Sequence, residues 1–103
     1  MKFTKPKWYT DPGHGWLRVE TLELHVLGIA GDISGYSYLH PSGKFAYLEE
    51  DCDATVFIDA YGRERYEKEG IPLTDQYSER SRIRDYPSYY AEYVQQRAEF
   101  LGL

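Results

Sequence analysis

The sequence contains very little cysteine: Cys52 is the only one in 103 residues. A single cysteine excludes an intramolecular disulfide, and the N-terminus shows no signal-peptide pattern. Both features indicate a reducing, cytoplasmic setting. The sequence also lacks any apolar run near the roughly 18 residues that a membrane span requires. We therefore expect a soluble protein in the cytoplasm of a host cell, with no membrane partner.

Positive charge is scarce relative to negative charge. Lysine and arginine number 12 against 17 aspartates and glutamates, which gives a formal net charge of -5. Such a chain repels nucleic-acid phosphates at long range, so general nucleic-acid binding is disfavoured. An acidic protein is instead suited to a partner with a basic surface.

Aromatic residues are abundant. They make up 17% of the sequence, with 11 tyrosines and 2 tryptophans, although the hydrophobic fraction is only 42%. A chain of this composition folds, and its length fits one domain, residues 1–103. Tyrosine is enriched in binding patches because its rigid ring gives a large contact area, but many tyrosines simply cover a small core.

The first third of the chain alternates extended segments with turns. Residues 1–9 place aromatic residues between lysines, which predicts a strand with one aromatic face, and Pro6 limits this strand to a sheet edge. Proline and glycine predict a loop at 10–15, followed by a strand at 16–19. Residues 20–27 fit both a strand and a helix, and Gly28 favours a short helix.

The middle of the chain predicts a β-hairpin followed by a helix. Residues 36–39 and 44–48 alternate in polarity around a connection at 40–43, as hairpin strands do. Asp51 is a candidate N-cap for a helix that ends at residue 61, before Gly62. The β-branched residues within 54–61 leave a strand open as the alternative.

The last third is dominated by charge and then by tyrosine. Residues 63–84 are charged and interrupted by Gly70 and Pro72, which predicts an exposed connection with at most a short helical turn. A final helix is expected to start at Asp85 or Ser88 and to cover the sheet. Its apolar stripe would consist of Tyr86, Tyr89, Tyr90, Tyr93, Val94, Phe100 and Leu101.

These elements together predict an α+β fold. The expected sheet is small and antiparallel, and it contains the N-terminal strand, the strand at 16–19 and the hairpin at about 36–48. Two or three helices are expected to pack on one face of this sheet. The length excludes a two-domain enzyme architecture.

An acidic stretch joins the predicted hairpin to the predicted helix. Glu49, Glu50, Asp51 and Asp53 surround Cys52. Carboxylates bind hard cations, and a cysteine with a histidine suits zinc, but the spacing matches no known metal-binding motif. Carboxylates also favour the positive end of a helix and remain solvated there. We therefore expect no metal and no cofactor, and an acidic face that a partner can use.

His14 and Cys52 are the candidate catalytic residues. His14 lies between two glycines, where a side chain is often exposed. A helix N-terminus lowers the pKa of a thiol, whereas the four carboxylates near Cys52 disfavour its thiolate. A buried, unreactive cysteine is therefore expected.

Three arginines provide the basis of a nucleic-acid alternative. Arg80, Arg82 and Arg84 alternate, which would place them on one side of an extended segment where they could follow phosphates. Bases could stack on an aromatic platform formed by Trp8, Trp16, Tyr36, Tyr38 and Tyr47. The acidic character of the whole chain opposes this interpretation.

Two strings resemble known sequences: DPGHGWLRV at 11–19 and YLEEDCDA at 47–54. Over about the first 60 residues, the chain is similar to small proteins of phages and other mobile elements that have no assigned activity. The resemblance therefore implies no catalytic residue. It implies a context, because small acidic phage proteins are often inhibitors or adaptors of host machinery, including CRISPR effectors.

The function expected from these features is non-catalytic binding of a host protein or nucleoprotein complex with a basic surface, as an anti-CRISPR inhibitor would do. The residues expected to contact this partner are Glu49, Glu50, Asp51, Asp53, Tyr36 and Tyr38. One alternative is a small metal-dependent enzyme that uses His14 with residues 49–53. Another is a binder of single-stranded nucleic acid that uses the three arginines.

Overall fold

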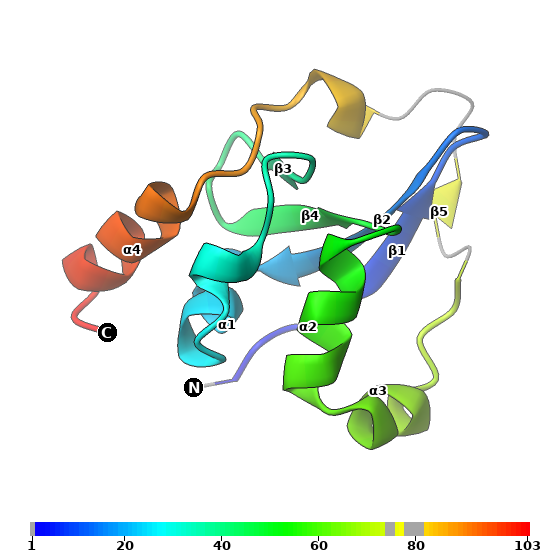
Figure 1. The fold of residues 1–103 in the computed structure, drawn as a ribbon, viewed down its shortest axis with the longest axis horizontal. Coiled ribbons are helices and arrows are strands. Elements are labelled where there is room, and N and C mark those ends of the chain that lie inside the picture. Colours follow the sequence, from blue (N-terminus) through cyan, green and yellow to red (C-terminus); the bar gives the residue numbers. More distant parts are fainter. Residues whose placement is uncertain (1, 74–75, 78–81) are drawn as a thin grey trace.

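A computed structural model describes residues 2–73, 76–77 and 82–103, and a β-sheet forms its centre (Figure 1). The antiparallel strands are β1 (Lys7–Thr10), β2 (Gly15–Glu20), β3 (Tyr38–Leu39) and β4 (Phe45–Glu49). They pair in the order β3-β4-β2-β1, and the two-residue β5 (Gln76–Tyr77) adds to β1 in parallel. The longest pairing, between β2 and β4, therefore lies inside the sheet.

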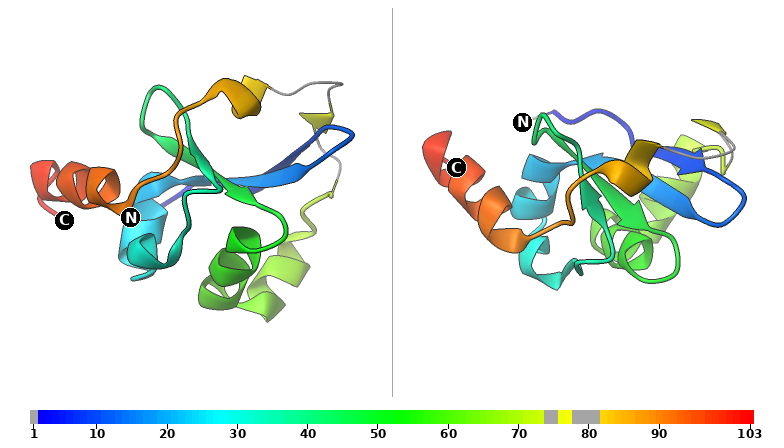
Figure 2. Two further views of the ribbon diagram at one scale, coloured as in Figure 1. Left: turned by 45° about the horizontal axis from the view of Figure 1, so that its top comes forward. Right: turned by 90° about the horizontal axis from the view of Figure 1, so that it is seen from above.

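Three of the described helices lie on one side of the sheet, and a 3₁₀ turn lies on the other. The helices are α1 (Thr21–Val26), α2 (Asp53–Tyr61), α3 (Arg63–Glu69) and α4 (Ala91–Phe100), and the 3₁₀ turns are η1 (Ala30–Asp32) and η2 (Arg82–Asp85). In the left view of Figure 2, α1, α2 and α3 lie below the sheet and η2 lies above it. The predicted α+β fold is confirmed.

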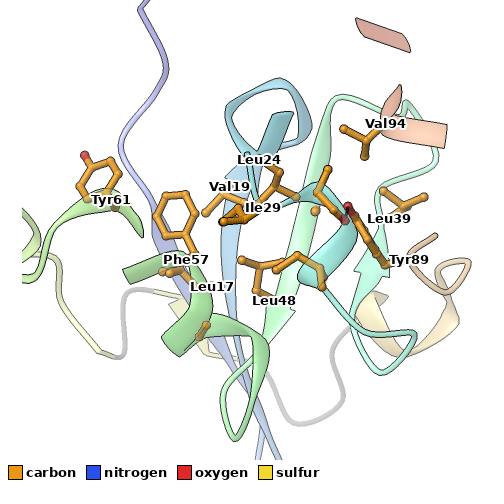
Figure 3. Packing of buried hydrophobic residues seen from close by; sticks show 14 of the residues in the cluster. Leu17, Val19, Leu24, Ile29, Leu39, Leu48, Phe57, Tyr61, Tyr89 and Val94 are labelled. Carbon is orange, nitrogen blue, oxygen red and sulfur yellow. Dashed lines mark hydrogen bonds between the residues drawn. The ribbon is translucent and has the colours of Figure 1, made fainter. Parts of the chain in front are cut away.

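The pleat of β2 and β4 sends side chains alternately to the two faces of the sheet. Leu17 and Val19 of β2 join Ala46 and Leu48 of β4 in a fully buried aliphatic layer on the helix side. Phe57 of α2 packs onto this layer with an exposed fraction of 0% (Figure 3). The core therefore lies between the sheet and its helices.

The opposite face of the sheet is aromatic. Trp16 and Tyr47 are buried there against Ile83 of η2, with Tyr9, Tyr38, Phe45 and Tyr86 packed around them. The guanidinium of Arg18 lies 4.5 Å from the centre of the Phe45 ring, at a distance suited to a cation–π contact. This face ends at the last residue of β4, Glu49, which is paired with Trp16 across the sheet.

Local sequence signals predicted several elements correctly. The hairpin at 36–48 is confirmed, because β3 and β4 pair with Tyr38 opposite Tyr47. The two segments left open between strand and helix both form helices, α1 and α2. Gly62 follows the last residue of α2 with a φ of 103°, a backbone conformation that glycine adopts without strain.

Gly43 shows why the hairpin connection needs glycine. Its φ is 77°, and a Cβ atom at this position would lie 1.6 Å from the hydroxyl oxygen of Tyr93 on α4. Any side chain would therefore displace Tyr93 as well as strain the backbone. The glycine lets α4 approach the hairpin closely.

The N-terminal strand is not the edge strand with one aromatic face that the sequence predicted. Residues 2–6 are not in a strand, and the second half of β1 lies between β2 and β5. Pro6 precedes the strand, so it does not interrupt the hydrogen-bond ladder. Trp8 belongs to the helix-side core, whereas Tyr9 packs on the opposite face.

The described residues between 63 and 84 are also more regular than predicted. Residues 63–69 form α3 immediately after Gly62, although the helix buries none of its side chains. Ion pairs between residues four apart, Arg65 with Glu69 and Glu64 with Lys68, support it instead. The partly buried Tyr66 also packs against the core, but one such residue in seven gives no helical periodicity in the sequence.

The final helix begins later than predicted and packs elsewhere. Its N-cap is Tyr90, and residues 86–90 are not helical. Tyr89 is buried in the core, whereas Phe100 is 90% exposed, so the expected aromatic stripe is not formed. α4 packs mainly against α1 and η1 through Val94 and Ala98. Docking of Tyr89 in the core, a tertiary effect, overrides the sequence periodicity.

Among the described residues, no helix combines the length and the apolar character needed to cross a membrane. The longest of them, α4, has ten residues and carries charged side chains.

Glu23 is an unusual carboxylate inside the helix-side layer. It is only 4% exposed, and its Oε1 atom has no hydrogen-bond partner. Burial raises the pKa of Glu23 to about 7; Arg65 opposes this shift, whereas Glu20 and Glu69 reinforce it. Since the folded pKa lies above the unfolded one, folding favours protonated Glu23, and this stability is lost as the pH rises from 4.5 through about 7.

We expect Glu23→Gln to remove this pH dependence. The substituted amide carries no charge, so the variant should gain about 2 kcal/mol over the wild type at pH 8 and little at pH 4.5. Urea unfolding at several pH values measures the difference in unfolding free energy. A difference that is constant from pH 4.5 to pH 8 would contradict the assignment.

Candidate functional site

A pocket of about 280 Å³ opens where the aromatic face of the sheet ends. It is lined by His14, Trp16, Tyr36, Tyr38, Glu49, Asp51 and Arg84. These residues come from the turn before β2, from β2 itself, from β3 and the segment leading into it, from the end of β4 and the turn after it, and from η2. The pocket is therefore built by segments that are far apart in the sequence.

Glu49 forms the acidic base of this pocket. It is 9% exposed, because the register of β2 and β4 places it opposite Trp16 on the aromatic face. Its Oε2 atom accepts hydrogen bonds from the backbone N–H of Asp51 at 2.9 Å and from the Cys52 thiol at 3.3 Å. Its Oε1 atom is buried without a hydrogen bond and lies 3.6 Å from His14 Nδ1.

The turn that carries His14 is held by a buried aspartate. Asp11 Oδ1 accepts hydrogen bonds from the backbone N–H groups of Gly13 and His14, both at 3.0 Å. The guanidinium of Arg84 donates two further bonds to Asp11, at 2.6 and 2.7 Å, and lies over the Trp16 ring. The imidazole of His14 itself remains 45% exposed, so it can reach a ligand.

A second buried aspartate positions the tyrosine wall. Asp53 is 3% exposed, and its carboxylate accepts hydrogen bonds from the backbone and hydroxyl of Ser34 and from the hydroxyl of Ser37. Ser37 Oγ in turn accepts the backbone N–H of Glu49 at 2.9 Å. Tyr36 and Tyr38 flank Ser37, so this network fixes them beside the end of β4. Tyr36 itself is 77% exposed.

The structure brings together most, but not all, of the residues expected to contact a partner. Tyr36, Tyr38, Glu49 and Asp51 all line the pocket, and Glu50 lies beside it. Asp53 is the exception, because its carboxylate is buried and fully engaged with serines. Its assignment to a partner surface was therefore wrong.

The expected helix cap was also wrong in detail. The N-cap of α2 is Cys52, with no side-chain cap hydrogen bond, and Asp51 lies before it. The carboxylate of Asp51 therefore does not satisfy the helix start. It lines the pocket instead.

Cys52 is exposed and not buried as predicted. The pKa of its thiol is nevertheless raised, first by local desolvation of the sulfur and then by its hydrogen bond to Glu49, while the hydrogen bond with Ser34 acts against this shift. A thiol that donates to a carboxylate keeps its proton and is a poor nucleophile. This geometry does not favour Cys52 as a nucleophile, although the residue is exposed.

Ligand atoms of four residues gather at the mouth of the pocket. One ligand atom each from His14, Glu49, Glu50 and Asp51 can be chosen so that all four lie within 4.8 Å of one another. No metal motif is visible in the sequence, because His14 and Glu49 meet only through the pairing of β2 with β4. The sequence predicted no metal site, whereas the structure places four possible metal ligands together.

Most of the arginines and aromatic residues expected to bind nucleic acid are not arranged or exposed as that alternative requires. Arg80 lies outside the described residues, and Arg82 and Arg84 belong to the 3₁₀ turn η2, so they do not share one side of an extended segment. Arg84 is bound to Asp11. The proposed stacking residues Trp8, Trp16 and Tyr47 are buried, so they cannot form a platform for bases.

The sequence interpretation gave Asp11 no role, and it assigned Trp16 and Arg84 only to the nucleic-acid alternative, not to this site. The Asp-Pro-Gly-His order around Asp11 is typical of an Asx-type turn, so the support of the His14 loop was readable from the sequence. The pairing of Arg84 with Asp11 spans 73 residues and leaves no local signal.

Comparisons with protein-family models, with curated proteins and with solved structures found no match to this chain.

We expect Asp53→Asn to destabilise the protein by about 2 to 3 kcal/mol, because an amide cannot accept all the hydrogen bonds that serve a buried carboxylate. Asp59→Asn is the matched control in the same helix, since its exposed pair with Arg63 is worth only about 0.5 kcal/mol. Urea unfolding measures both. Equal losses in the two variants would contradict a structural role for Asp53.

Proposed function

We propose that this protein is a non-catalytic binding module, and that its pocket receives a basic side chain from a partner protein. The observation that carries this proposal is the convergence of Tyr36, Tyr38, Glu49 and Asp51 in one pocket, although they come from separate segments of the chain. These residues are suited to a lysine or arginine side chain.

The pocket combines two kinds of attraction for a cation. Aromatic rings attract a cation over their faces, and Tyr36 and Tyr38 contribute two such rings to the lining. The Trp16 ring is buried and already lies under the guanidinium of Arg84. The carboxylates of Glu49 and Asp51 add direct charge pairing. The positive charge of Arg84 is already paired with Asp11, so it opposes a cationic ligand only weakly.

The charge of the whole chain supports the same kind of partner. A net charge of -5 steers the protein towards basic surfaces and away from nucleic acid. Nucleic-acid-binding proteins of a host, including defence complexes, present such surfaces. By occupying a basic surface, the protein would exclude the nucleic acid that normally binds there, as an anti-CRISPR inhibitor would.

Short peptides with a single arginine or lysine in a glycine–serine background test the pocket directly. Titration into isotopically labelled protein, followed by amide NMR shifts, should move the signals of the pocket residues. Citrulline or acetyl-lysine at the same position should abolish the shifts, because these side chains carry no charge. Peptide shifts that map onto α3, or that do not depend on the charge, would contradict the proposal.

A double variant distinguishes peptide binding in the pocket from attraction by the overall negative charge. Tyr36→Ala with Asp51→Asn removes one exposed ring and one charge from the pocket, and we expect about tenfold weaker peptide binding. Tyr90→Ala with Glu67→Gln removes the same groups elsewhere and should leave the affinity unchanged. Equal weakening in both variants would show that binding follows net charge alone.

A further inference from the structure

We propose that His14, Glu49, Glu50 and Asp51 bind one divalent transition-metal ion of the zinc class. Their ligand atoms lie within 4.8 Å of one another at the mouth of the pocket. They combine an imidazole nitrogen with carboxylate oxygens, which is a common set of zinc ligands. This inference goes beyond the proposed function and does not depend on it.

The unpaired oxygen of Glu49 distinguishes this cluster from an ordinary acidic surface. The side chain of Glu49 is 12% exposed, and its Oε1 atom is shielded from solvent without a hydrogen bond. A buried acceptor without a partner costs free energy, and an ion bound at that atom would recover this cost. His14 is the nearest basic group, but at 3.6 Å it forms an ion pair only when protonated.

Only small movements are needed to close the site around an ion. Zinc bonds to nitrogen and oxygen of about 2.1 Å place neighbouring ligands of a tetrahedral site about 3.4 Å apart. The present spread of 4.8 Å must therefore shrink by about 1.4 Å. The imidazole of His14 is 45% exposed, and Glu50 and Asp51 are exposed, so all three can rotate towards the fixed Glu49.

The ligand set also selects a class of ion. Calcium and magnesium prefer oxygen ligands alone, and magnesium gives up its waters reluctantly. Imidazole nitrogen is favoured by zinc, copper, nickel and iron. With one imidazole and three carboxylates, the cluster should therefore bind zinc in the presence of excess magnesium.

An ion at this site would use groups that the proposed basic ligand also uses. His14, Glu49 and Asp51 all belong to the cluster and line the pocket, and Glu49 and Asp51 are the carboxylates proposed to pair with the basic side chain. Since a metal ion neutralises these carboxylates, zinc and a basic peptide should compete. The affinity of the protein for its partner would then depend on the zinc concentration.

Zinc titration of tag-free protein tests the site. Isothermal titration calorimetry with zinc chloride, in buffer with excess magnesium, should give one ion per chain. His14→Gln and Asp51→Asn should each weaken zinc binding at least tenfold, since even changes around a ligand commonly cost about 10- to 100-fold. Both side chains are exposed, so the melting temperature without zinc should remain unchanged.

Matched controls remove the same groups elsewhere. His25→Gln and Glu67→Gln should bind zinc like the wild type. The proposal is overturned if no zinc binds, if magnesium displaces it, or if His14→Gln binds as tightly as His25→Gln. Because zinc is titrated without peptide, this result is independent of whether the basic peptides bind.

Discussion

The rest of the site depends on the hydrogen bonds that the buried carboxylate of Asp53 accepts. It accepts hydrogen bonds from Ser34 and Ser37, and Ser37 accepts the backbone N–H of Glu49. One buried side chain therefore joins the start of α2, the segment leading into β3 and the end of β4. These segments carry Tyr36, Tyr38 and Glu49, so the distance between the tyrosine wall and the acidic base is set by this network. A charged group in a 3%-exposed position is tolerable because donors surround it.

On the His14 side of the pocket, a second buried aspartate, Asp11, also holds two segments together through hydrogen bonds. Asp11 accepts backbone hydrogen bonds from the His14 turn and two bonds from Arg84, which ties η2 to that turn. Asp11 and Asp53 are thus buried carboxylates with several donors each. Glu49 differs, because one of its oxygens has two donors and the other has none. This contrast separates a structural acid from one that is open to a ligand.

The elements set by nearby residues were predicted from the sequence, whereas those set by tertiary contacts were not. The hairpin and the end of α2 follow from alternation and from Gly62, which act over a few residues. The start of α4 could not be predicted from local sequence. Tyr89 lies outside the helix, because its hydroxyl donates a hydrogen bond to the carbonyl of Ala30 in the core. In the site, the acidic stretch was recognised from composition. The sequence could not show that Asp53 is buried while Asp51 is exposed. Asp53 is held by Ser37 and Ser34, which lie 16 and 19 residues before it in the sequence, so there is no local signal.

The arrangement around Glu49 favours a cation over covalent chemistry. The Cys52 thiol donates to Glu49, which keeps the proton on sulfur and removes the most nucleophilic side chain near the pocket. The other oxygen of Glu49 is already dehydrated, so a cation that reaches it gains attraction without stripping water from that atom. The exposed acids of α3 must lose water when they pair and therefore gain less. A basic side chain and a metal ion would both benefit from this difference, so under both proposals the pocket would contribute more to selectivity than the overall negative charge.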